Sequence, residues 1–211
     1  LKDIQVFAAS DNEIVIGAGV CHADVAASSD VQKSIPALAY LAQHIGDPQV
    51  RNRGTLGGSI ANNDPAADYP AAIVALDATV HTSNREIAAD DFFTGMFETA
   101  LEPGELITKV SFPVPKRAAY AKFPNPASRY AVVGVMVAET SSGVRVAVVG
   151  AGPGVFRMTE MEAALSKSFT VDALKNISVP ADDLNEDLHA TADYRAHLVG
   201  VMAQRAVASI A

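Results

Sequence analysis

The residues with the clearest binding chemistry lie in one polar segment, residues 47–70, which reads DPQVRNRGTLGGSIANNDPAADYP. Its centre, GTLGGS, has the composition of an anion-binding loop. Glycines let backbone N–H groups approach a phosphate closely and can turn through positive φ. Thr55 and Ser59 add hydroxyl donors, and Arg51 and Arg53 add positive charge. The alternative interpretation is a glycine-rich surface turn with capping residues.

A second glycine-rich sequence, VVGAGPG at residues 148–154, follows a predicted strand and precedes a predicted helix, as a dinucleotide-binding turn does. The G-x-G-x-x-G pattern requires glycine at position 155, which is Val155 here, and no clear second strand with a ribose-binding acid follows. We interpret this segment as a strand-to-helix connection. An NAD-dependent enzyme that uses Gly150 to Gly154 is the alternative.

Cys21 and His22 are adjacent at a predicted helix start, but the pattern offers no acid partner to orient them for nucleophilic catalysis. We therefore expect both to be structural. The other four histidines are scattered without metal-ligand spacing. Cys21 is the single cysteine, so the chain predicts no internal disulfide, no iron–sulfur cluster and no Cys-type zinc site of its own.

Composition narrows the class of protein. With 211 residues, 49% hydrophobic and 19% charged, the chain is globular and long enough to bury a substantial core. A net charge of −8 argues against nucleic-acid binding, which needs basic patches. No apolar run reaches the ~20 residues that a transmembrane helix requires.

Strand hairpins followed by helices predict an α+β fold. We expect a subdomain boundary between residues 112 and 113, at the start of a proline-rich stretch that ends at residue 126. The predicted strands are residues 13–16, 79–82, 85–88, 106–112, 131–138 and 144–149. The predicted helices are residues 22–28, 32–45, 71–76, 159–166 and 194–208. Between residues 46 and 68 we expect a polar loop.

The full segment, QVRNRGTLGGSIAN followed by DPAAD, resembles the second flavin-binding loop of the FAD-binding medium subunit of molybdenum hydroxylases, the carbon-monoxide dehydrogenase and xanthine dehydrogenase family. Weaker similarity extends over residues 16–24, 103–108, 122–134 and 194–206. The resemblance implies an FAD-binding subdomain over residues 1–112 and a flavoprotein C-terminal domain, a small antiparallel sheet with helices, over residues 113–211.

The resemblance also implies which residues contact FAD, with Gly57, Gly58 and the Thr55 and Ser59 hydroxyls at the phosphate and ribityl groups. Most of these residues have a second interpretation. Asp68 could cap the following helix. Ile45 and Leu106 could be core residues, Lys122 a solvated lysine and Tyr130 an aromatic packed on the sheet. The cofactor-binding residues that we predict are Ile45, Thr55, Leu56, Gly57, Gly58, Ser59, Asp68, Leu106, Lys122 and Tyr130.

The family implies an electron-transfer role. An iron–sulfur small subunit and a molybdenum-cofactor large subunit would be its partners, and FAD would pass electrons to an acceptor such as a quinone or NAD. We expect a cytoplasmic location, or one at the inner face of the membrane through the complex. The family's first FAD subdomain carries an AGG-type loop that is not found ahead of Leu1, so we expect a chain without that subdomain. The alternative role is a flavin-less binding or assembly module.

Overall fold

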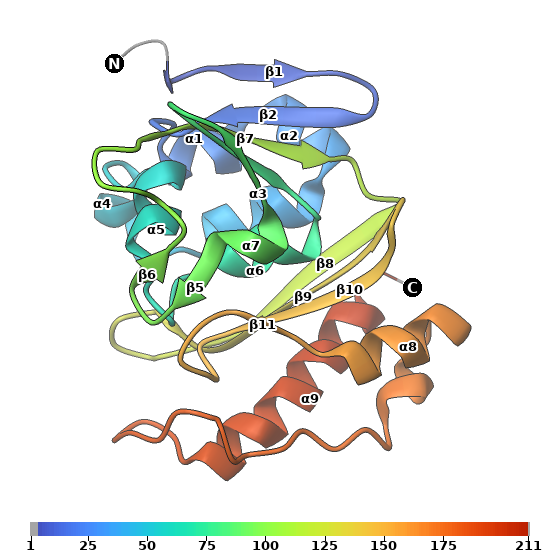
Figure 1. Cartoon of the computed structure of the whole chain (residues 1–211). Coiled ribbons are helices and arrows are strands. Elements are labelled where there is room, and N and C mark those ends of the chain that lie inside the picture. The colour runs from blue at the N-terminus through green and yellow to red at the C-terminus, as the bar shows by residue number, and fades with distance from the viewer. Residues whose placement is uncertain (1–3, 211) are drawn as a thin grey trace.

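The computed structural model describes residues 4–210, and in them helices pack against two antiparallel sheets (Figure 1). The larger sheet has the strand order β1-β2-β7-β3-β4. Its strands are β1 (Phe7–Ala9), β2 (Glu13–Gly17), β7 (Ile107–Pro113), β3 (Thr79–Thr82) and β4 (Glu86–Ala88). The chain between β2 and β3, residues 18–78, leaves this sheet and returns to it, and it carries the helices that surround the polar segment.

The second sheet has the order β11-β10-β9-β8. Its strands are β8 (Arg117–Pro124), β9 (Ala131–Thr140), β10 (Gly143–Val149) and β11 (Phe156–Arg157). A short hairpin, β5 (Phe93–Gly95) and β6 (Glu98–Thr99), lies apart from both sheets.

The helices that precede the second sheet in sequence lie apart from the helices that follow it (Figure 1). The first group comprises α1 (His22–Ala27), α2 (Ser29–Ser34), α3 (Pro36–Gln43), α4 (Pro48–Arg51), α5 (Leu56–Asn62), α6 (Tyr69–Ala75) and α7 (Ala89–Phe92). The second group comprises α8 (Thr159–Lys167), the 3-10 helix η2 (Val171–Leu174) and α9 (Ala192–Ala208), and it covers the face of the second sheet away from α6.

Strand β9 is buried on both faces, which explains why its sequence is a continuous apolar run. Val133, Val135 and Val137 face the cluster that contains the α9 side chains. Met136 and Ala138 point the other way, into the cluster that α3 and α6 share with the first sheet. Because the sheet contributes to both clusters, the predicted boundary at residue 112 stays a prediction.

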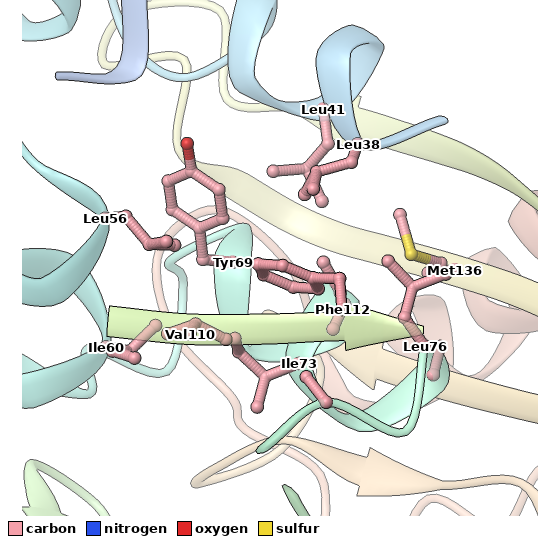
Figure 2. Packing of buried hydrophobic residues seen from close by; sticks show 14 of the residues in the cluster. Leu38, Leu41, Leu56, Ile60, Tyr69, Ile73, Leu76, Val110, Phe112 and Met136 are labelled. Atoms are coloured by element: carbon pink, nitrogen blue, oxygen red, sulfur yellow. The ribbon is translucent and has the colours of Figure 1, made fainter. Parts of the chain in front are cut away.

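The first cluster is centred on β7 and α6. Tyr69 and Phe112 are 0% exposed and pack with Leu56, Ile60 and other aliphatic side chains. Figure 2 shows the Tyr69 hydroxyl at the end of the side chain away from Phe112. This core fixes the first residue of α6 against the first turn of α5, and those two helices border the polar segment.

The α+β prediction is confirmed, and two local predictions are wrong. The helix expected over residues 32–45 is broken at Ile35, because Pro36 begins α3 and disfavours helical geometry in the residue before it. The expected loop at residues 46–68 contains α4 and α5. Strand β8 lies in the stretch between prolines, and as an edge strand it tolerates Pro124 at its end.

None of the helices in residues 4–210 is long and apolar enough to cross a membrane.

Candidate functional site

A cavity of about 480 Å³ opens beside the polar segment. This volume lies within the range of small-molecule and cofactor sites. The residues around it come from α1, from the α3–α6 segment and from the turn before β9. They are His22, Ile45, Gly46, Asp47, Val50, Arg53, Gly54, Thr55, Gly58, Ser59, Asn62, Asp64, Ala67, Asp68, Ser128 and Tyr130.

The first turn of α5 forms one wall of the cavity. Thr55 is the N-cap, and its Oγ1 accepts a hydrogen bond from Gly58 N at 3.1 Å. Leu56 N and Gly57 N donate to the carbonyl oxygens of Val20 and Ala18, and Ser59 N donates to Thr55 O. All four backbone N–H groups of this turn therefore have protein partners. The expected cradle of glycine N–H groups is not formed, and the remaining donors here are the Thr55 and Ser59 hydroxyls.

Gly57 and Gly58 differ in the space that is available for a side chain. A Cβ at Gly57 would lie 2.5 Å from the Ala18 Cβ, so this glycine lets α5 pack on the end of β2. A Cβ at Gly58 would meet one side-chain atom, Thr55 Oγ1, at 3.0 Å. Both glycines are helical rather than in positive φ. Gly58 is exposed and lines the cavity, whereas Gly57 is buried.

Asp68 lies at the floor of the cavity, 4% exposed. It does not cap α6 with its side chain, in contrast to the capping interpretation. Its carboxylate instead accepts a hydrogen bond from Tyr120 Oη at 2.5 Å and lies 2.9 Å from Lys122 Nζ. Burial raises the pKa of Asp68, and the Lys122 charge and the Tyr120 hydrogen bond oppose that rise.

Lys122 is not a solvated lysine, because its side chain is 5% exposed and its Nζ also donates to His44 O at 3.0 Å. It borders a neighbouring cavity, which it shares with Tyr40, His44, Arg51 and Arg129. Its charge is compensated by Asp68, so Lys122 contributes little net positive potential to either cavity.

The other predicted contacts are divided. Ile45 and Tyr130 line the cavity, and Tyr130 is 49% exposed. Leu56 is 0% exposed and belongs to the core. Leu106 is 68% exposed, so it is not a core residue. It is also absent from the described lining of this cavity. Glu105 holds the turn before Leu106, since its carboxylate accepts bonds from Thr82 Oγ1 at 2.6 Å and Arg85 Nε at 3.1 Å.

His22 lines the cavity, although its sequence context predicted a structural role. It begins α1 and is 4% exposed. Burial, with a smaller effect of the Arg51 charge, lowers its pKa to about 4, so the ring is neutral near pH 7. Adjacent Cys21 has a local role, with Sγ 3.7 Å from Asn52 O. The sequence signal for His22 was its place directly after a short strand-to-helix turn.

The glycine-rich sequence at residues 148–154 is not a dinucleotide-binding turn. Strand β10 pairs antiparallel with both β9 and β11, so the βαβ unit that such a turn needs is not formed by these strands. Gly150 has φ +81°, and a Cβ there would lie 2.5 Å from Ala131 O. This glycine serves close backbone packing, and the segment connects β10 to the short strand β11, which precedes α8.

The lining of the 480 Å³ cavity fits the phosphate and ribityl groups of the FAD that the resemblance implies. The Thr55 and Ser59 hydroxyls can donate hydrogen bonds to phosphate oxygens. The Arg53 guanidinium can donate as well and also carries a positive charge. Ile45 and Tyr130 offer apolar and aromatic surface for the ring. The match rests on side-chain donors, because the first-turn N–H groups are already bonded.

Comparison with known proteins identifies the family. The family model described as "FAD binding domain in molybdopterin dehydrogenase" matches residues 1–115. The carbon monoxide dehydrogenase medium chain of Hydrogenophaga pseudoflava is 33% identical over 210 residues, covering 92% of this chain and 73% of that protein. The nicotine 6-hydroxylase medium subunit of Paenarthrobacter nicotinovorans is 34% identical over 205 residues, covering 90% and 72%.

Solved structures show the same fold over the whole chain. The carbon monoxide dehydrogenase of Hydrogenophaga pseudoflava that lacks the Mo-pyranopterin moiety superposes with a TM-score of 0.87 at 33% identity, covering 100% of this chain and 79% of that one. Quinoline 2-oxidoreductase from Pseudomonas putida 86 gives a TM-score of 0.87 at 25% identity, with the same coverage.

Proposed function

This chain belongs to the family of FAD-binding domains in molybdopterin dehydrogenases, and we propose that it transfers electrons, through FAD, from the iron–sulfur clusters of a partner subunit to an acceptor. It is an FAD-binding medium subunit of an oxidoreductase, like its relatives, which are named as medium chains and subunits. The partners we propose are an iron–sulfur small subunit and a molybdenum-cofactor large subunit. The location we propose is cytoplasmic.

One observation carries the proposal for the site. Six of the ten residues that the resemblance assigns to FAD line one cavity, although they come from separate elements: Ile45, Thr55, Gly58, Ser59, Asp68 and Tyr130. A glycine-rich surface turn with capping residues would not bring these six together. The convergence supports an FAD site at α5 and α6.

FAD supplies the redox chemistry when bound, and the chain supplies binding, orientation and electrostatics. We propose that the Thr55 and Ser59 hydroxyls donate to phosphate or ribityl oxygens and that Arg53 neutralises phosphate charge. We propose that Tyr130, which is half-exposed and lines the cavity, covers an aromatic ring of the cofactor. Asp68 and Lys122 form an ion pair with no net charge, which holds the start of α6 against β8 at the floor of the cavity.

An electron-transfer measurement tests the function. The FAD-loaded chain is mixed anaerobically with a dithionite-reduced iron–sulfur subunit from the same complex, after removal of excess dithionite, and the flavin absorption band is followed. We expect the band to bleach and to return when a quinone or NAD is added. Retention of the oxidised flavin band, although the iron–sulfur subunit is bound, would contradict the proposed electron path.

A further inference from the structure

The His22 ring occupies a position between the core and the cavity. Its centroid lies 5.3 Å from that of the Tyr69 ring, which belongs to the core beside α5 (Figure 2). On another side the ring faces Gly54, whose position would place a Cβ 2.6 Å from His22 Nε2. The absence of a side chain at Gly54 therefore makes the space that the imidazole needs beside Thr55 and Arg53.

The two ring nitrogens have different surroundings. Nδ1 is fully buried and has no hydrogen-bond partner among residues 4–210. Nε2 also lacks a partner in the described part of the chain, but it does not belong to the fully buried unsatisfied atoms. Nε2 is consequently the nitrogen open to the cavity. A neutral ring with its proton on Nε2 leaves a lone pair on buried Nδ1 and presents an N–H donor to the cavity.

An Nε2–H donor would supply a hydrogen bond that the backbone of the α5 first turn cannot give to a ligand. The N–H groups of the α5 first turn are all bonded to protein acceptors, so a phosphate or ribityl oxygen here must be held by side chains. The Thr55 and Ser59 hydroxyls and the Arg53 guanidinium stand around the same cavity. Nε2, the ring nitrogen that is not fully buried, has no partner among the described residues, and a ligand oxygen in the cavity would give its N–H an acceptor.

We propose that His22 is a binding residue for FAD, with its Nε2–H donating a hydrogen bond to an oxygen of the diphosphate or ribityl group. This inference rests on the proposed FAD site and adds a residue to it. The rival explanation is a structural ring that shares a buried water with Tyr69, whose hydroxyl is also buried without a partner among the described residues.

A pair of isosteric variants separates the two explanations. The amide nitrogen of His22→Gln can reach the position of Nε2, whereas that of His22→Asn falls near the position of Nδ1. FAD affinity is measured by fluorescence titration, and folding by circular dichroism and thermal melting. We expect His22→Asn to weaken FAD binding about tenfold or more, and His22→Gln to stay within about threefold of wild type.

A spectroscopic readout covers the case in which both variants lose stability. The wild-type chain is labelled with 15N-histidine and titrated with FAD, and the imidazole nitrogens of its five histidines are followed by NMR. We expect the His22 Nε2 resonance to shift on saturation while the resonances of His81 and His197, away from the cavity, stay in place.

Each outcome has one meaning. Wild-type affinity in both variants, or a His22 Nε2 resonance that does not move at FAD saturation, would overturn the role of His22 while leaving FAD binding intact. A wild-type chain that binds no FAD in either titration would overturn the proposed site itself. A shift of Nε2 together with rescue by Gln supports the inference.

Discussion

The carboxylate of Asp68, at the start of α6, lies 2.9 Å from the ammonium of Lys122 on β8, and the two side chains are only 4% and 5% exposed. The pair joins two segments that lie more than fifty positions apart in sequence, and Tyr120 adds a hydrogen bond from β8 to the same carboxylate. The floor of the cavity therefore depends on a buried ion pair.

Removing the charge of Asp68 should lower the free energy of unfolding more than removing the charge of Lys122. Asp68→Asn leaves the Lys122 ammonium buried without a counter-charge, which costs about 3–5 kcal/mol. Lys122→Met leaves Asp68 with its Tyr120 partner, and because burial raises its pKa the carboxyl can take up a proton, so we expect a smaller cost of about 1–3 kcal/mol. Urea unfolding at pH 7 measures both, and equal costs would contradict this account.

Gly57 and Gly58 are adjacent but differ in what an added methyl group would meet. Gly57→Ala places a Cβ 2.5 Å from Ala18 Cβ, so we expect about 1–3 kcal/mol of destabilisation. Gly58→Ala meets only the Thr55 hydroxyl, and alanine favours the helix, so stability should stay within about 1 kcal/mol while FAD affinity falls. Thermal melting with a parallel FAD titration distinguishes them, and a reversed order of stabilities would refute the packing argument.

Stability depends on pH through His22. Its pKa is lowered from 6.5 to about 4 in the folded chain, so the unfolded chain binds more protons between these values. The free energy of unfolding should therefore fall as the pH drops from 6.5 to 4, by up to about 3 kcal/mol relative to His22→Gln. Asp68, whose pKa is raised, titrates in both proteins, and the difference between them isolates His22. Parallel stability curves for the two proteins would contradict this prediction.

Replacing Leu106 tests whether this residue contributes to FAD binding rather than to the stability of the fold. It is 68% exposed, so Leu106→Ser should change the free energy of unfolding by less than about 0.5 kcal/mol. The resemblance implies that Leu106 contacts FAD, so the loss of this apolar contact should weaken FAD binding about tenfold. Unchanged affinity in the FAD titration would make Leu106 an ordinary exposed residue.

Much of the fold was predictable where one physical signal dominated. The run that forms β9 and the Gly143 turn after it specify a hairpin, and that prediction is confirmed. Helices α4 and α5 were not predicted, because their polar and glycine-rich sequences have weak helix propensity. Side-chain caps from Asp47 and Thr55, together with burial of Leu56, stabilise them instead.

The site was predictable as a segment but not as a geometry. The polar segment identified Thr55, Ser59 and Asp68 as candidates, and these residues line the cavity. The sequence did not reveal that Ala18 and Val20 occupy the α5 backbone donors, since that depends on how α5 packs at the end of β2. For the same reason His22, which begins α1, was assigned a structural role.

The most direct test of the central claim is flavin retention by the purified chain. The chain is incubated with excess FAD and gel-filtered, and its visible absorption spectrum is recorded beside those of Gly58→Val and the control Gly200→Val. Gly200 lies on α9, and the described residues leave open space around it. We predict near-stoichiometric flavin in the wild type and the control, and little in folded Gly58→Val. Equal flavin in all three proteins, or none in the wild type, would contradict the assignment of FAD to this cavity.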